Sequence, residues 1–356
     1  MAAAPAPVNA ASSSVAVSSR AALIPLGQAL FFDARLSRDG STSCSTCHLP
    51  ARYFSDGLAT SRGVAGAVGS RNAPSLLNVA QIDSQFWDGR AQTLEQQAVL
   101  PLVNPREMDM ASLQAVVDVV RRAPDYRPLF ARAFGVRDAG AIRIDMIAAA
   151  LAAYERSLNV EDSPFDRAAF GARSGALSRQ AERGRQLFIG AARCAACHLV
   201  GPDAATFTDN QFHSLSIGLQ PLADRLAALT LGVAELRRQG RSPDEIVLAN
   251  REFAALGRFV VTLAPTDLGA FRTPGLRNVA MTAPYMHDGS VATLAEAVDD
   301  EVYYRSSESG HPLLLTPTER GDLVAFLESL TSPLDQVLAK APASMRSLAT
   351  AEPAPK

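Results

Sequence analysis

The sequence predicts a mainly α-helical protein of two domains, with long loops and little β structure. Apolar residues recur at helical spacing over residues 113–120, 144–151 and 323–330, which indicates amphipathic helices. Alternating patterns of the kind that predict strands are scarce and short. Long loops with glycine and proline occupy residues 57–75 and 264–290. Small helices joined by long loops are typical of proteins whose core is completed by a large apolar cofactor.

The beginning of the chain has a composition of its own. The first 22 residues are rich in alanine, serine, proline and valine and carry a single charged side chain, Arg20. They lack the basic start and the dense leucine core of a secretory signal. We therefore expect residues 1–22 to be a disordered leader, left after removal of a signal or added to the chain artificially. A degenerate export signal is the alternative.

Two short strings with the same order indicate a weak internal repeat. Each of them, 27–31 and 184–188, has glycine first and a Leu-Phe pair last, and each predicts a short helix that delivers this pair to a core. A capping box at Ser242 opens a further helix in the second half. The expected divisions are residues 23–165 for a first domain, 172–335 for a second domain, 220–257 for a helical insertion in the second domain, and 336–356 for a tail.

Composition excludes several classes of protein. The chain has 356 residues, of which 47% are hydrophobic and 20% are charged, as in ordinary globular proteins. The net charge is only −2, and the basic residues form no blocks, which argues against nucleic acid as the main partner. No run of about 18 apolar residues occurs, so we expect no membrane-spanning helix.

All four cysteines fall in two strings with the spacing Cys-x-x-Cys-His. The first contains Cys44, Cys47 and His48. The second contains Cys194, Cys197 and His198. This spacing is the attachment signal for c-type haem, because two thiols reach the vinyl groups of one porphyrin while the adjacent histidine faces the iron.

Other uses of the cysteines fit the spacing less well. A zinc ribbon would place two such pairs about 15–20 residues apart, and a thioredoxin-like dithiol would need a βαβ setting. We therefore predict two covalent haems c, held by two cytochrome c-like domains. Because bacteria attach haem c in oxidising space outside the cytoplasm, we expect a periplasmic protein.

A longer set of strings resembles the bacterial di-haem cytochrome c peroxidases and the related MauG-type enzymes. The resemblance runs from about residue 26 to residue 331, and the strings stand in the same order as in that family. The matching segments are 30–33, 36–37, 71–75, 86–90, 95–98, 107–108, 153–156, 271–274, 276–278 and 283–289. The resemblance implies a two-domain, mainly helical protein in which the haem on His48 reacts with peroxide and the haem on His198 passes electrons to it.

The resemblance also implies roles for individual residues. Trp87, the only tryptophan, matches the residue that relays electrons between the haems. Gln97 and Glu107 match the polar residues of the peroxide pocket, where a carboxyl can move a proton between the two oxygens. Without the resemblance, Trp87 would be read as a packing residue and Glu107 as a solvated carboxylate.

A metal site and an oligomeric state follow from the resemblance in the same way. Asn72 and the backbone carbonyls of Thr282 and Pro284 match a calcium site, and such oxygens are the ligands that calcium takes. We therefore expect one calcium ion. A homodimer is expected from the family alone.

Two positions depart from the family pattern. Many of these peroxidases close the first haem with a histidine from the loop after the first motif, but here Val64 stands at that place and residues 62–69 contain no strong iron ligand. We therefore expect the first haem to be open in the oxidised protein, as in the MauG-type enzymes. The sixth ligand of the second haem is methionine in the peroxidases and tyrosine in MauG; the ungapped position here is Glu301, and a two-residue insertion would supply Tyr303. Met286 is a further alternative if the local fold differs.

Three functions follow from these observations. The first is reduction of hydrogen peroxide to water with electrons from a small cytochrome c or copper protein. The second is a MauG-like oxidation of a side chain on a partner protein, favoured by the open first haem and the absence of methionine at the sixth-ligand position. The third is electron transfer without catalysis, against which Gln97 and Glu107 argue.

Overall fold

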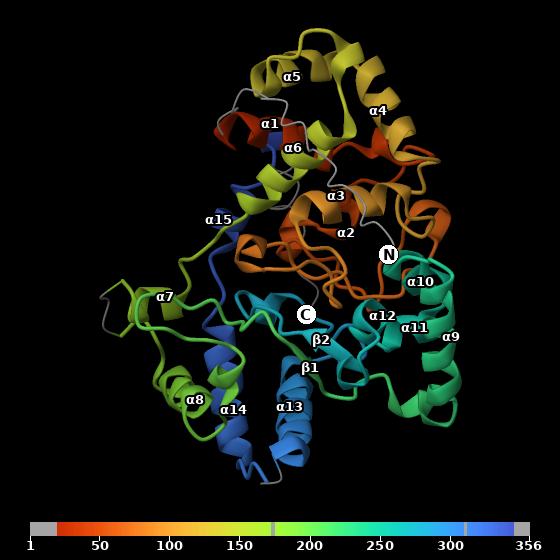
Figure 1. Ribbon diagram of the computed structural model, residues 1–356. Coiled ribbons are helices and arrows are strands. Elements are labelled where there is room, and N and C mark those ends of the chain that lie inside the picture. The colour runs from red at the N-terminus through yellow and green to blue at the C-terminus, as the bar shows by residue number, and fades with distance from the viewer. Residues whose placement is uncertain (1–19, 172–174, 310–311, 345–356) are drawn as a thin grey trace, which may run out of the picture.

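The computed structural model describes residues 20–171, 175–309 and 312–344 and is built mainly of helices (Figure 1). Within these ranges the sheet consists of two three-residue strands, β1 (Phe212–Ser214) and β2 (Ala270–Arg272), which pair antiparallel. The prediction of a mainly α protein with little β structure is confirmed. The first 19 residues of the expected leader lie outside the described residues, and a helix already begins at Arg20. None of the described helices is both long and apolar enough to cross a membrane.

The first body of the molecule is a helical core that surrounds the first Cys-x-x-Cys-His motif. Its helices are α1 (Arg20–Phe31), α2 (Cys44–Cys47), α3 (Leu94–Val103), α4 (Leu113–Arg122), α5 (Arg127–Phe134) and α6 (Ile144–Arg156). Helix α1 packs along α6, and they approach so closely that a Cβ on Gly27 would lie 1.9 Å from the carbonyl oxygen of Ala150. This close crossing explains the glycine of the first repeated string. The Leu-Phe pair that follows it, Leu30 and Phe31, is fully buried.

The second body repeats this arrangement around the second motif. Its helices are α7 (Pro164–Ala169), α8 (Arg179–Ile189), α13 (Leu294–Ser309) and α14 (Pro317–Glu328). Helix α8 packs on α14, and a Cβ on Gly184 would lie 1.8 Å from the carbonyl oxygen of Asp322. Phe188 is buried in this core, as Phe31 is in the first. The two glycine strings therefore mark the same helix crossing in two places.

A third cluster of helices lies between the two strands in sequence and has a small core of its own. Its helices are α9 (Leu226–Arg238), α10 (Pro243–Ala249), α11 (Arg251–Ala255) and α12 (Phe259–Thr262). The predicted capping box is present, with Ser242 and Glu245 bonding to each other's backbone N–H groups. Val233, Val247 and Val260 are among the buried residues of this core. We call residues 220–262 the insertion.

The ends of the second body differ from the expected divisions. Helix α7 falls where the boundary between domains was expected, yet its Phe165 is buried in the second core and its Asp166 forms a buried ion pair with Arg277. The expected tail, 336–356, begins inside α15 (Leu334–Leu338), and Val337 is buried in the core of the first body. The chain thus returns to the first body at its end, because Val337 offers an apolar side chain that covers that core. The remainder of the tail from residue 345 lies outside the described residues.

The structure contains a longer repeat than the two glycine strings, with a constant offset of 200 residues. Asn78 and Asn278 both adopt a left-handed conformation before a short 3₁₀ helix, and both are buried. An isolated bridge joins residues 85 and 91 in the first copy and residues 285 and 291 in the second. Helices α3 and α13 then begin at Leu94 and Leu294. The two motifs are therefore followed by matching segments, which end in matching helices.

Candidate active site

One cavity of about 650 Å³ extends between the two bodies and reaches both motifs. The first body contributes Cys44, Cys47 and His48 to its lining, and the second contributes Cys194, Cys197 and His198. None of these four cysteines forms a disulfide. Because both motifs open into the same cavity, groups bound to them would lie within one continuous enclosure.

His48 is oriented as an iron ligand by its surroundings. Its Nδ1 lies 3.0 Å from the carbonyl oxygen of Phe54. A carbonyl only accepts hydrogen bonds, so Nδ1 carries the proton and Nε2 keeps its lone pair for a metal. Burial lowers the pKa of His48, which favours the neutral imidazole that ligation requires. The ring of Phe31 lies 6.5 Å from the imidazole and limits its rotation.

His198 is held in the same way. Its Nδ1 lies 2.9 Å from the carbonyl oxygen of Phe207, so the proton is again on Nδ1 and Nε2 is available. Burial lowers the pKa of this histidine too. The ring of Phe188 lies 6.4 Å away, matching the distance between Phe31 and His48. Two histidines with the same orientation at two Cys-x-x-Cys strings fit two haem c groups.

Two buried arginines also fit this cofactor. Arg71 and Arg272 line the cavity, and among the described residues Nε and Nη1 of Arg71 and Nε of Arg272 have no hydrogen-bond partner. Burial lowers the pKa of each guanidinium to about 10. Leaving buried cationic donors unpaired is costly, so a carboxylate belongs beside them. Haem carries two propionate carboxylates, which these arginines would pair with.

Glu107 and Gln97 lie together in the cavity wall near the first motif. Asn104 donates a hydrogen bond of 2.7 Å from Nδ2 to Oε1 of Glu107. Burial nevertheless raises the pKa of Glu107 to about 7, although the positive charge of Arg90 and this hydrogen bond act to lower the pKa. The Oε1 atom of Gln97 is buried and has no partner among the described residues. A carboxyl whose pKa is raised to about 7, in the same cavity lining as an unsatisfied amide, is suited to binding a small polar molecule and moving its proton.

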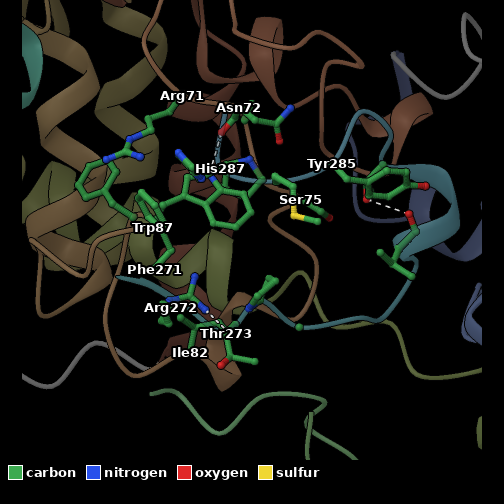
Figure 2. A pocket seen from close by; sticks show the side chains of 18 of the residues that line it. Arg71, Asn72, Ser75, Ile82, Trp87, Phe271, Arg272, Thr273, Tyr285 and His287 are labelled. Atoms are coloured by element: carbon green, nitrogen blue, oxygen red, sulfur yellow. Dashed lines mark hydrogen bonds between the residues drawn. The ribbon is translucent and has the colours of Figure 1, made fainter. Parts of the chain in front are cut away.

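Trp87 is fixed between the two bodies by its backbone and its indole. Its Nε1 donates to the carbonyl oxygen of Asn72 at 3.0 Å, and its own carbonyl accepts from the N–H of Arg272 at 2.8 Å. Figure 2 shows the indole in the middle of the cavity wall, close to Phe271 and His287. The ring of Phe271 stacks on the imidazole of His287 with centroids 3.7 Å apart. The aromatic side chains therefore form a group at the junction of the two bodies.

The three residues expected at a calcium site all line this cavity. They are Asn72, Thr282 and Pro284. The N–H of Asn72 donates to the carbonyl oxygen of His287 at 2.9 Å, which joins the two segments that carry these residues. The Nδ2 of Asn72 donates to the carbonyl oxygen of Leu58 at 2.9 Å. This hydrogen bond uses the amide nitrogen, so the amide oxygen Oδ1 can serve as an acceptor or a metal ligand.

The two expected sixth-ligand positions lie in different surroundings. Glu301 lines the cavity on α13, and its charge acts on the thiols of Cys194 and Cys197. Tyr303 lies on the same helix but is 70% exposed and is not part of the lining. Met286 also lines the cavity. In the 200-residue repeat, Glu301 occupies the position of Pro101 in α3.

The loop after the first motif contributes Ser61 and Gly69 to the cavity lining, but not Val64. Val64 is only 2% exposed and does not line the cavity. Its N–H donates to the carbonyl oxygen of Glu107 at 2.8 Å, and a Cβ on the preceding Gly63 would lie 2.3 Å from the carbonyl oxygen of Arg106. The loop is thus packed against the backbone of the segment that carries Glu107.

Sequence reasoning did not single out Glu155, which lines the same cavity. Its side chain is buried, and its Oε2 has no partner among the described residues. Burial raises the pKa of Glu155 to about 8, so the acid is largely neutral at pH 7. The signal that could have found it is a charged residue on the apolar face of the helix that ends at Arg156.

The histidines outside the motifs have separate surroundings. His213 forms an ion pair of 2.8 Å with Asp209 near Cys197, while His287 is buried against Phe271. Burial, together with the charge of Arg71, lowers the pKa of His287 to about 3. His311 lies outside the described residues.

Comparison with known proteins identifies the family. The family model described as di-haem cytochrome c peroxidase matches residues 21–174. The chain is 40% identical to the methylamine utilization protein MauG of Methylorubrum extorquens over 314 residues, which is 86% of this chain and 77% of that protein. It is 35% identical to the cytochrome c551 peroxidase of Pseudomonas aeruginosa over 306 residues, 86% of this chain and 78% of the other. The chain belongs to the di-haem cytochrome c peroxidase and MauG family.

Solved structures agree with this assignment. A MauG-like protein associated with microbial copper homeostasis superposes with a TM-score of 0.69 at 33% identity, covering 87% of this chain and 89% of that one. The di-haem peroxidase BthA from Burkholderia thailandensis superposes with a TM-score of 0.68 at 26% identity, covering 91% and 89%. Members of this family carry haem c, so the protein is an oxidoreductase that carries haem c. The resemblance inferred from the sequence is confirmed.

Proposed function

We propose that the protein reduces hydrogen peroxide to water at the cavity beside His48, with electrons entering through the group on His198. The observation that carries this proposal is that Glu107 and Gln97 both line the cavity that reaches the first motif, whereas Val64, at the place of the family's closing histidine, does not line it. In the overall reaction, one molecule of hydrogen peroxide takes up two electrons and two protons and gives two molecules of water.

The chain's own residues would manage the protons. Haem supplies the iron that binds and cleaves peroxide and stores the oxidising equivalents. Glu107, with a pKa of about 7, accepts a proton from hydrogen peroxide and returns it to the outer oxygen as that oxygen leaves. The unpaired amide oxygen of Gln97 accepts a hydrogen bond from the bound peroxide. Asn104 holds the Glu107 carboxyl in position through the 2.7 Å hydrogen bond.

Trp87 would relay electrons between the two motifs. Asn72 accepts from its indole N–H and Arg272 donates to its backbone carbonyl, and the side chain lies in the wall of the cavity that reaches both histidines. An indole can lose one electron, so a fixed tryptophan between two redox centres shortens each transfer step. This role rests on the position of Trp87 and on the family resemblance together.

Glu301 is our choice for the sixth ligand of the second haem. It lines the cavity close to the second motif, whereas Tyr303 on the same helix is exposed. The repeat supports this choice, because α3 and α13 follow their motifs in the same way, and Glu301 stands where α3 has Pro101. A carboxylate favours ferric iron and lowers the reduction potential, which suits a haem that must reach high oxidation states.

Further features of the proposal concern binding partners and location. Each body would form one haem domain, and Asn72 with the carbonyls of Thr282 and Pro284 would hold one calcium ion, since all three line the same cavity. We propose a periplasmic location, because haem c is attached outside the cytoplasm. A small cytochrome c or copper protein would donate the electrons, nucleic acid has no role, and a homodimer follows from the family alone.

A MauG-like oxidation of a partner protein is the second candidate function. The packed loop at Val64 and the glutamate at position 301 favour it, because both departures from the peroxidase pattern would stabilise an oxidised protein. A non-catalytic electron carrier is the third alternative, and it has no use for the acid at position 107.

Steady-state turnover separates these functions. The holoprotein is mixed with reduced cytochrome c and hydrogen peroxide, and oxidation of the cytochrome is followed optically. We expect steady consumption that depends on both reagents. Slow consumption together with a long-lived oxidised protein would favour the MauG-like function instead. A protein that exchanges electrons with cytochrome c but ignores peroxide would be a carrier.

A further inference from the structure

Helix α10 of the insertion reaches the first body although it belongs to the second half of the chain. Its Asp244 forms an ion pair with Arg90 of the first body, with Oδ1 and Nε 2.9 Å apart. Its Val247 and Leu248 line the cavity. Figure 1 shows the insertion beside the first body, with α10 at the edge that faces it. The wall of the cavity is therefore completed by a segment distant in sequence.

Helix α10 and Glu107 line the same cavity. The charges of Arg90 and of Asp244 both act on the carboxyl of Glu107, so all three groups lie within electrostatic range of one another. Val247 follows Asp244 by three residues and therefore lies on the same face of the helix. The apolar side chains of α10 that line the cavity therefore lie on the helix face of Asp244, whose partner Arg90 also lines the cavity.

The insertion is held firmly against the first body. Arg90 lies over the ring of Phe86 at 3.5 Å and donates to both carboxylate oxygens of Asp88 at 3.1 and 3.2 Å. From the other side, Arg258 donates to the backbone carbonyls of Asp88 and Gly89 at 3.0 and 2.9 Å. At Gly89, where φ is +66°, a Cβ would lie 2.3 Å from the ring of Phe212. These contacts fix α10 relative to the segment that carries Trp87.

We propose that α10 is a size-selecting wall of the peroxide pocket, with Val247 and Leu248 as specificity-determining residues and Asp244 as the residue that positions them. The wall admits hydrogen peroxide and excludes organic hydroperoxides, which carry a bulky alkyl group on one oxygen. This inference rests on the proposed function, because it takes the group on His48 to be the one that reacts with peroxide.

The expected selectivity follows from the size of the side chains. In a packed apolar pocket, each added or missing methylene changes discrimination between substrates by about 10–200-fold. Replacing Val247 and Leu248 with alanine removes several carbon atoms from the wall. A bulky molecule should gain far more from that space than a small one.

Ligand binding to the oxidised holoprotein tests the wall without turnover. Cyanide serves as the small ligand and 4-phenylimidazole as the bulky one, and the haem absorption spectrum reports the Kd of each. In the variant Val247→Ala/Leu248→Ala we expect the ratio of the two Kd values to shift at least about tenfold toward the bulky ligand. Asp244→Asn should shift the ratio of Kd values in the same direction but by a smaller amount. It weakens the ion pair that positions α10 and leaves the side chains of Val247 and Leu248 unchanged.

Val233→Ala is the matched control. Val233 is buried in the same core of the insertion as Val247 but does not line the cavity, so Val233→Ala loses the same atoms as Val247→Ala without widening the pocket. The ratio should stay at its wild-type value. An equal shift of the Kd ratio in both variants would show that destabilising the core of the insertion is sufficient to admit the bulky ligand. The proposal that α10 selects ligands by size would then be rejected.

The same variants are then compared for their rates with hydrogen peroxide and cumene hydroperoxide. The ratio of the two rates should move toward cumene hydroperoxide in the double variant only. If the wild type binds cyanide but neither the ratio of Kd values nor the ratio of rates changes in the double variant, α10 is not a size-selecting wall. The proposed function is unaffected by that result. If the wild type binds no cyanide and does not react with hydrogen peroxide, the proposed function fails and the wall fails with it.

Discussion

The first and second bodies hold their Cys-x-x-Cys-His motifs in the same way but differ in the helix that follows. In both, a glycine allows two helices to cross closely, a phenylalanine lies about 6.5 Å from the histidine ring, and a backbone carbonyl fixes Nδ1. The later helix carries Gln97 and Pro101 in the first body, but Ala297 and Glu301 at the same positions in the second. One framework thus presents a polar pocket without a strong ligand on one side and a carboxylate on the other.

This difference indicates that the repeated framework determines how each haem would be held. A few side chains that differ between the two copies would determine which reaction each haem supports. Trp87 and His287 are also equivalent in the repeat, so only the first copy has the indole that we propose as the electron relay. Glu155 of α6 corresponds to Leu327 of α14, because Tyr154 and Phe326 precede them at the two close crossings. The cavity lining therefore receives Glu107 and Glu155 from the first body and Glu301 from the second.

The largest effect should come from removing Glu107, an acid that the first body contributes to the cavity wall. Glu107→Gln keeps the size of the side chain but cannot accept a proton, so we expect the rate of reaction with peroxide to fall by about 10²–10⁴-fold. Stopped-flow absorption of the holoprotein measures this rate. Glu95→Gln, on the same body but outside the cavity lining, is the control and should keep the wild-type rate.

The pH dependence of the same reaction sharpens this test. Burial raises the pKa of Glu107 to about 7, and the base form is the ionised one. The rate should therefore rise with pH through about pH 7 and level off above it. Glu107→Gln should show no such rise. A wild-type rate that is flat between pH 5 and pH 9 would remove Glu107 from the role of base.

Placing the carboxylate of the second body at the equivalent position in the first should abolish the expected difference between the two haem sites. Pro101→Glu places a carboxylate at the position that Glu301 occupies in the repeat. We expect the high-spin ferric EPR signal to be replaced by a low-spin one, and the peroxide rate to fall in proportion to the open fraction. Pro101→Ala is the control for loss of proline. If Pro101→Glu stays high-spin, the equivalence of the two positions does not extend to the iron.

The reciprocal change concerns the second haem alone. Glu301→Met should raise its reduction potential by an appreciable part of the roughly 0.8 V range that axial ligands span. Spectroelectrochemical titration measures this potential. Tyr303→Phe is the control on the same helix and should leave the potential unchanged, since Tyr303 is exposed. The opposite pattern would assign the ligand to Tyr303.

The smallest expected effect is on stability. Burial raises the pKa of Glu155 to about 8 from an ordinary value of 4.5, so folding favours the protonated acid. Its contribution is fully present below about pH 4.5 and is lost as the pH rises toward 8, at about 1.4 kcal/mol per pH unit. Glu155→Gln, which stays neutral, should therefore gain stability relative to the wild type between pH 5 and pH 8. Denaturant unfolding of the holoprotein measures this, and a difference that does not change with pH would contradict it.

Much of the fold could be predicted from local sequence. The helical class followed from apolar spacing, and the capping box at Ser242 was visible in four residues. The burial of Val337 in the first body could not be predicted, because it depends on where the chain returns after α14. The burial of Phe165 in the second core carries no local signal either, since only packing shows which core receives a short helix.

The site was predictable to a different degree. The Cys-x-x-Cys-His spacing alone indicated both haem motifs, because the chemistry requires those residues side by side. The 200-residue repeat was present in the sequence at Asn78-Val79-Ala80 and Asn278-Val279-Ala280, but its meaning depends on the matching backbone conformations. The contact between Asp244 and Arg90 joins residues 154 positions apart and carries no local signal.

The measurement that tests the central claim most directly is the EPR and optical spectrum of the fully oxidised holoprotein, before and after one equivalent of hydrogen peroxide. We expect one high-spin and one low-spin ferric haem, with the high-spin signal lost at once and without prior reduction. Two low-spin signals that do not respond until the protein is half-reduced would contradict the account. In that case a ligand closes the first site, and the two bodies do not differ as proposed.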